Sequence, residues 1–385
     1  MKKLHTSGIR KAVSSTRNKM SDIRHHYREK DYSELSEEEV TIAQYKAHRW
    51  SKLVVIIGML ILFVVLVSLL LIVGEYEIDI GTVYSIIWDH IVGNEITADP
   101  MADQVVWKWR LPTILTAIGV GVGLAIAGAA MQSMMKNPLA DPYTTGISSG
   151  AALGATIAMT AGITIINGSY GMIVNAFVFA LIPSAFIIAL SKFRKPSPAM
   201  IILSGIALMY VFNAAQSYMM LVADPNAVAA VYSWTVGSLE GMNWSKVGIM
   251  FIFVVLGSCI LMWEARVLNA MNSGDSYAKS LGINVDRVRV IILVSVSILA
   301  AGIVSFTGII GFVGLVAPHI ARILTGADNR ILIPLSALVG ACLVMVAHLF
   351  VEGFLSFALP VGLITSLIGG PIFMIMIIRQ KNEVW

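Results

Sequence analysis

Residues 53–73 read LVVIIGMLILFVVLVSLLLIV, an apolar run without a charged side chain. A helix needs about 20 consecutive apolar residues to cross the hydrocarbon core of a bilayer, so this run predicts a membrane-spanning helix. Further apolar runs follow at residues 113–135, 142–162, 173–190, 199–222, 247–263, 290–308, 309–323, 331–351 and 360–378. The sequence therefore predicts an all-α, polytopic membrane protein with about ten transmembrane helices.

The composition of the whole chain agrees with that prediction. Hydrophobic residues make up 57% of the 385 residues and charged residues only 13%, whereas soluble domains are about 25% charged. This composition excludes a soluble enzyme, a disordered chain and a disulfide scaffold.

The first 52 residues differ from the rest. They hold 12 Lys and Arg beside 7 Asp and Glu, and they lack the apolar core of a signal peptide. We expect residues 1–52 to form a polar cytoplasmic extension and residues 53–385 the transmembrane domain. The extension is either a solvated tail or a basic arm for anionic lipid headgroups.

Basic residues outside the extension predict the orientation. If both termini are cytoplasmic, the inner loops collect most of the Lys and Arg, whereas the first long outer loop is acidic. Cytoplasmic loops of membrane proteins carry this excess of basic residues. We therefore expect a multi-pass protein of the cell (plasma or inner) membrane with both termini inside.

Polar residues within the predicted spans are few. Asn213 and Gln216, with Met220, fall on one face of the run 199–222. They either form hydrogen bonds between helices or line a weakly polar translocation path. No span has a central Asp or Glu, which an ion-coupled secondary transporter, the alternative class, would normally need.

Glycines recur at four-residue spacing, as in Gly119 and Gly123 and again in Gly146, Gly150 and Gly154. Small residues at this spacing let helix backbones pack closely in a membrane. The chain has no Walker-type phosphate loop. Any ATP and Mg²⁺ must therefore bind to a partner subunit, and we expect no cofactor, no metal site and no catalytic residue in this chain.

The longest predicted cytoplasmic loop, residues 264–289, is long for a simple connection. Within it, residues 275–281 predict a short amphipathic helix that begins after Gly274 and ends at Gly282. Such a helix could dock into a groove on a partner protein. The alternative is an ordinary connecting loop.

Four stretches carry a family resemblance. Residues 110–154 (RLPTILTAIGVGVGLAIAGAAMQSMMKNPLADPYTTGISSGAALG) and 311–334 (GFVGLVAPHIARILTGADNRILIP) resemble the FecCD-like permeases of type II ABC importers for ferric siderophores, haem and cobalamin. Residues 274–283 (GDSYAKSLGI) and 359–377 (LPVGLITSLIGGPIFMIMI) resemble the same family. The four motifs occur in the order in which that family has them.

The resemblance implies two permease subunits, forming a homodimer or a heterodimer, with two ATP-binding subunits inside and an extracytoplasmic substrate-binding protein outside. It places the ATPase-coupling helix at Gly274, Asp275, Tyr277, Ala278, Leu281, Gly282 and Ile283. It also makes Arg110, and with it Lys108, candidate contacts for the binding protein. Thr113, Val351 and Glu352 stand where family members often carry further outer arginines.

These observations predict a transport subunit that is not itself an enzyme. We expect it to import an iron-chelate, with a ferric siderophore ahead of haem or cobalamin on base rate alone. Membrane lipid is an expected partner, and nucleic acid is not.

Overall fold

The structure is a computed structural model that describes residues 37–74, 76–95, 98–354 and 359–379. The chain divides into two compact units, Met1–Val55 and Ile56–Trp385. Most of the predicted extension, residues 1–36, lies outside the described residues. Its remainder belongs to the first long helix, which starts at Glu37, well before the predicted residue 53.

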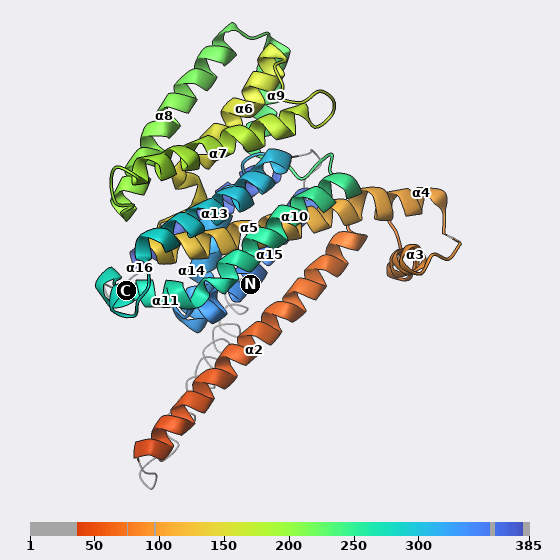
Figure 1. Ribbon diagram of the computed structural model, residues 1–385. Helices are drawn as coiled ribbons and strands as arrows, with labels where there is room; N and C mark the ends of the chain where they lie inside the picture. The colour runs from red at the N-terminus through yellow and green to blue at the C-terminus, as the bar shows by residue number, and fades with distance from the viewer. Residues whose placement is uncertain (1–36, 75, 96–97, 355–358, 380–385) are drawn as a thin grey trace, which may run out of the picture. The chain divides into compact units, whose positions relative to one another are not determined.

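The described part of the chain is built from helices (Figure 1). In chain order these are α2 (Glu37–Ile72), α3 (Ile80–Val92), α4 (Pro100–Asp103), the π-helix η1 (Gln104–Arg110), α5 (Leu111–Met135), the 3₁₀ helix η2 (Pro142–Thr145), α6 (Ile147–Ala161), α7 (Gly171–Ser191), α8 (Pro198–Val222), α9 (Pro225–Val236), α10 (Trp244–Trp263), α11 (Ala265–Asn272), α12 (Asp275–Ser280), α13 (Val285–Thr307), α14 (Val313–Thr325), α15 (Asn329–Phe354) and α16 (Val361–Arg379).

Helix α5 lies at the centre of the second unit, where it packs against α10, α13, α14 and α15. Its glycines allow this crowding. A methyl group at Gly121 would meet the backbone of Gly340 in α15, and one at Gly128 would meet the carbonyl oxygen of Gly314 in α14. Hydrocarbon gives helices no hydrophobic reason to associate, so such close backbone contact supplies much of the attraction.

A second group contains α6, α7, α8 and α9, which lie together in Figure 1. Gly150 and Gly154 of α6 pack against the backbone of α7 at Phe179 and Asn175. Helix α13 contacts α7 and so joins this group to the central one. The predicted close backbone packing is therefore confirmed for Gly150 and Gly154. Gly119 and Gly123 instead face side chains of α10 and α13, and Gly146 has φ +89° just before α6.

Among the described residues, seven helices are long and apolar enough to cross a membrane: 52–72 of α2, the continuous segment 100–135 ending in α5, and α7, α8, α10, α13 and 329–353 of α15. The other three predicted spans correspond to the shorter apolar helices α6, α14 and α16. Each predicted run thus contains a helix, and the number of ten spans stays a prediction.

Several boundaries were predicted wrongly. The chain leaves helix between Thr307 and Val313, where Gly308 has φ +69° and Phe312 φ +66°, so the eighth helix starts later than residue 309. The outer helices α3 and α9 were not predicted. Both have Asp at the N-cap, Asp79 and Asp224, whose carboxylates accept backbone N–H groups, a usual start signal.

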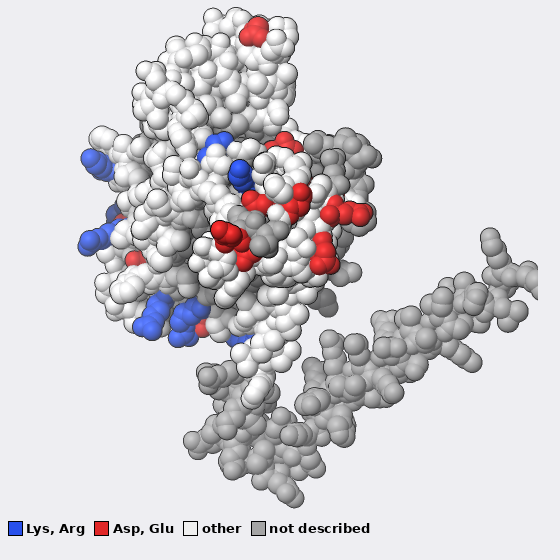
Figure 2. Space-filling view, turned by 90° about the vertical axis from the view of Figure 1, so that its right-hand side faces the viewer, with Lys and Arg blue, Asp and Glu red and all other residues white. Residues whose placement is uncertain are grey.

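Charged side chains separate on the surface. Figure 2 shows Asp and Glu gathered in one region and Lys and Arg mostly at other edges of the same view. The acidic residues of the outer segment 76–103 include Glu77, Asp79, Asp89, Asp99 and Asp103. Basic inner loops and an acidic outer loop predict such a separation of positive from negative side chains.

Candidate functional site: a short helix anchored to the bundle

Helix α12 is the centre of the predicted coupling segment. It spans Asp275–Ser280, one residue shorter than predicted, and it lies between glycines with positive φ, Gly274 at +127° and Gly282 at +79°. Residues with side chains rarely adopt this conformation, so the glycines let the chain turn into and out of the helix. The predicted short helix is therefore present.

The two sides of α12 differ in exposure. Ala278 is fully buried against the bundle, whereas Tyr277 and Leu281 keep 51% and 57% of their surface exposed. Ile283, also predicted for this site, is half-buried and donates its N–H to the carbonyl oxygen of Ala278. The segment thus exposes one aromatic and one aliphatic side chain, while the buried Ala278 packs against the bundle.

Asp275 anchors α12 to the membrane helices. Its carboxylate accepts hydrogen bonds from Lys136 Nζ at 2.9 Å and from Arg289 Nη2 at 2.7 Å. Partial burial raises the pKa of Asp275, but the hydrogen bonds from Lys136 and Arg289 outweigh that effect, so its pKa lies below the ordinary value. The carboxylate is therefore ionised at neutral pH and pairs with two cations.

The two cations belong to different elements. Lys136 is the C-cap residue of α5, in a left-handed conformation, and Arg289 lies in the first turns of α13. Arg289 is 5% exposed and also donates to the carbonyl oxygen of Pro196, between α7 and α8, at 3.1 Å. A displacement of α12 would therefore be transmitted directly to α5 and α13. Through Arg289 it would also reach Pro196, just before α8.

A second polar cluster joins the same cytoplasmic loop to α15. Asn269 of α11 donates to Asp328 at 2.7 Å and accepts the backbone N–H of Asn329 at 2.8 Å. Asp328 also pairs with Arg330, and these hydrogen bonds lower its pKa. The sequence did not single out this cluster, because only the fold brings residues 269 and 328 together.

On the outer side, Arg110 contacts backbone. Its guanidinium donates to the carbonyl oxygens of Leu71 at 2.7 Å, Ile72 at 3.3 Å and Tyr76 at 2.6 Å. These oxygens lie at and beyond the C-terminal end of α2, where a positive charge is favoured. Lys108 is exposed. Docking of a binding protein by Arg110 and Lys108 stays a prediction, and the observed contacts give Arg110 a helix-capping role.

The outer segment also contains a cluster that was not predicted. His90 Nε2 lies 2.6 Å from Asp103 Oδ1, and the His90 ring stacks on Trp107 with centroids 4.0 Å apart. Trp107 in turn contacts Trp244 of α10. These contacts fix α3 against the start of the second membrane helix. Trp244 is 137 residues from Trp107 in sequence, so no local pattern connects α10 to this cluster.

The predicted path residues lie on α8. Asn213 is exposed in this single chain, and Gln216 and Met220 are half-buried. Only Ile201 and Gly205 of α8 are buried, and the exposed residues include Tyr210, Tyr218 and Leu221. Most of α8 is thus left uncovered by this chain, and the path assignment stays a prediction.

The irregular segment 137–150 is buried in part, from Pro142 onward, whereas Leu139 is 47% exposed. Pro142 and Thr145 of η2 are buried, and the Tyr143 hydroxyl donates to the carbonyl oxygen of Ile310 at 3.2 Å. Arg322 lies in α14, 7% exposed, and donates to Gln132 of α5 at 3.1 Å. Among the described residues, no group of three or more His, Cys, Asp or Glu could hold a metal ion.

Comparison with known proteins identifies the family. Residues 59–379 match the FecCD transport family. The chain belongs to this family. FecCD proteins are the membrane-spanning permeases of ABC importers, so this chain is a multi-span transport subunit and not itself a catalyst.

Individual relatives match over most of the FecCD chain. An ABC transporter permease protein of Methanocaldococcus jannaschii is 36% identical, covering 89% of this chain and 99% of its own. The permease of an Fe(3+)-citrate import system of Bacillus subtilis is also 36% identical, over 83% of this chain and 95% of its own. A solved transporter described as of the metal-chelate type, in an inward-facing conformation, has a TM-score of 0.75 at 29% identity, covering 85% and 99% of the two chains.

Proposed function

We propose that this FecCD permease moves an iron-chelate from an extracytoplasmic binding protein into the cytoplasm, driven by ATP that two partner ATPase subunits bind and hydrolyse. Helix α12 carries the proposal. Its exposed Tyr277 and Leu281 offer a small apolar contact to a cytoplasmic partner, while Asp275 fixes the helix to α5 and α13.

A second copy of the chain completes the proposed path. Helix α8 exposes Tyr210, Asn213 and Leu221 along most of its length, and a homodimer would place two such surfaces around one channel. The wall is weakly polar and carries no charged residue in α8. Strong fixed charges would bind a bulky ligand tightly and slow its release, so a weakly polar wall suits passage.

The iron-chelate class rests on the Fe(3+)-citrate and metal-chelate relatives described above. Other family members are named for hemin transport in Yersinia pestis and molybdate import in Haemophilus influenzae. Haem and cobalamin are therefore the alternative cargoes.

Uptake by cells tests the cargo. We expect a host that lacks its own importers to accumulate ⁵⁵Fe-labelled ferric hydroxamate or ferric catecholate when it expresses this chain with its genomically adjacent ATPase and binding protein. Uptake should need all three proteins. Accumulation of haem, cobalamin or molybdate without any ferric chelate would replace the proposed cargo, and uptake unaffected by an inactive ATPase would contradict ATP-driven import.

A further inference from the structure

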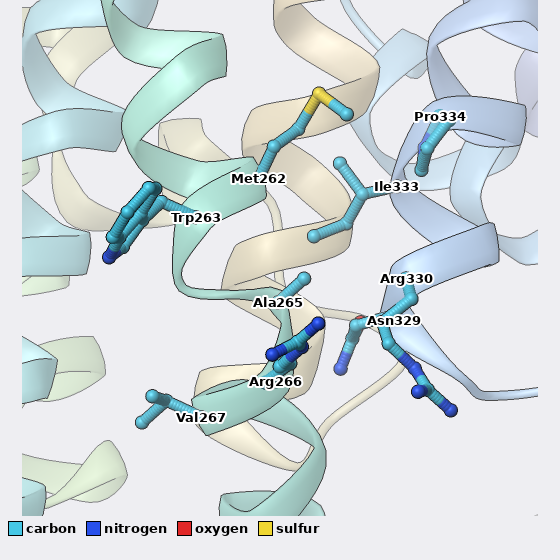
Figure 3. Close-up of a pocket in the computed structure, with 9 residues that line it drawn as sticks. All are labelled: Met262, Trp263, Ala265, Arg266, Val267, Asn329, Arg330, Ile333 and Pro334. Atoms are coloured by element: carbon cyan, nitrogen blue, oxygen red, sulfur yellow. The ribbon is translucent and has the colours of Figure 1, made fainter.

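A pocket of about 630 Å³ opens where α10 ends, α11 begins and α15 begins. Arg266 and Arg330 lie at one end of it, and Met262, Ile333 and Pro334 lie at the other, as Figure 3 shows. Its volume is in the range of small-molecule sites. The pocket thus has a cationic end and an apolar end.

The position of the pocket relative to the membrane follows from its helices. The candidate span of α10 ends at Trp263, and that of α15 begins at Asn329. Trp263, at the mouth, is 84% exposed, as is typical of an aromatic residue at the membrane surface. Because both spans end here on the side of the basic loops, the pocket lies at the cytoplasmic surface of the bilayer.

The cationic end carries a positive charge. Arg266 is exposed and makes no hydrogen bond or ion pair with any residue that the structure describes. Arg330 pairs with Asp328 at 2.7 Å, yet 61% of its side chain stays exposed. Arg266 therefore supplies a cation that no described carboxylate pairs with, beside the exposed Arg330, and Asn269 also donates a hydrogen bond to Asp328.

The pocket wall also contains an unsatisfied donor. Asn329 is fully buried, and its Oδ1 accepts a hydrogen bond from Ser133 at 2.8 Å. Its Nδ2 has no hydrogen-bond partner among the described residues. A buried amide without a partner costs free energy, which an oxygen of a bound ligand beside Asn329 would recover.

Apolar surface continues on the other side of Arg330. A groove of about 540 Å³ runs between α2, α5 and α15, with Leu60, Phe63, Ile118 and Val122 in its walls. Arg330 and Pro334 line both this groove and the first pocket. The two arginines therefore complement an anionic headgroup, and the groove complements long apolar chains attached to it.

We propose that this pocket binds an anionic phospholipid of the cytoplasmic leaflet. The phosphate lies between Arg266 and Arg330, and the acyl chains lie on Met262, on Ile333 and in the adjoining groove. Basic pockets between membrane helices on the cytoplasmic side suit such headgroups. A free phosphate ion would leave the apolar walls of the pocket and groove without a contact. A bound lipid would connect Arg266 of α11 to Arg330 of α15, close to α12. This role does not depend on which cargo the transporter carries.

Native mass spectrometry of the full-length chain, delipidated in a neutral detergent, tests the site. We expect dioleoyl-phosphatidylglycerol to stay bound at detergent concentrations that remove dioleoyl-phosphatidylcholine. Arg266→Gln should weaken phosphatidylglycerol binding about fivefold, since a basic residue near an anionic membrane surface contributes about that factor. Arg266→Lys should retain most of the binding.

Arg287→Gln provides the matched control. Arg287 is an exposed cation of the same cytoplasmic loop and does not line the pocket, so its variant should bind like the wild type. Equal retention of the two lipids, or equal weakening by Arg266→Gln and Arg287→Gln, would overturn the proposal. Inorganic phosphate that displaced phosphatidylglycerol at a concentration equal to that of the lipid would show a site for small anions. That result would also overturn the proposal.

Discussion

Asp275→Ala should lower the ATP turnover that loaded binding protein stimulates in the assembled transporter by about tenfold or more. The substitution removes the acceptor that Lys136 and Arg289 share, and it leaves the buried Arg289 without its carboxylate. Hydrogen bonds to charged groups contribute about 1.5–3 kcal/mol each, and the exposure of Asp275 places these at the lower end. Since about 1.4 kcal/mol is a factor of ten, detaching α12 at this point is enough for the expected loss.

Asp286→Ala is the control for that experiment. Asp286 is another carboxylate of the same loop, in the first turn of α13, where it contributes only about 0.3–1 kcal/mol through the helix dipole. Its variant should keep near-normal stimulation. Normal stimulation in Asp275→Ala, or an equal loss in both variants, would show that the Asp275 contacts do not transmit the ATPase movement.

Gly128→Ala should greatly reduce the yield of folded protein and lower its melting temperature by about 5–10 °C. The added methyl group would lie against the backbone of Gly314, so neither α5 nor α14 could relieve the overlap by turning a side chain. Overpacking typically costs about 1–3 kcal/mol, and a backbone collision belongs at the upper end of that range.

Gly248→Ala shows whether a new methyl group as such is harmful. Gly248 lies in α10, and a methyl group there meets no atom within 4 Å. Alanine favours helix over glycine by about 1 kcal/mol, so this variant should melt at the same temperature or slightly higher. Equal melting of Gly128→Ala and wild type would contradict the close approach of α5 and α14.

Apolar runs predicted the helices well because length and hydropathy are local properties of the chain. The boundary at 307–313 was missed, since an apolar stretch without charges gives no sign of where Gly308 and Phe312 take positive φ. The span predicted at 53–73 agrees with the candidate span 52–72 of α2, whereas the polar continuation of this helix over 37–52 was not predicted. Hydropathy detects the part of a helix within the membrane, and not its continuation into water.

The candidate site was predicted in part. The flanking Gly274 and Gly282 and an amphipathic pattern between them indicated α12. The sequence could not show that Asp275 meets Lys136, 139 residues away, or that Arg110 caps the end of α2. Such pairings depend on the packing of whole helices, which no local pattern encodes.

Uptake into sealed vesicles tests the central claim most directly. The chain, its partner ATPase and its binding protein are assembled in proteoliposomes with ATP at the ATPase side, no ion gradient and ⁵⁵Fe-labelled ferric chelate on the other side. Our account predicts accumulation that requires hydrolysable ATP and falls about tenfold with Asp275→Ala, in line with the loss of stimulated turnover. Accumulation without hydrolysable ATP, either in these vesicles or in matched vesicles that carry a proton or sodium gradient, would contradict it.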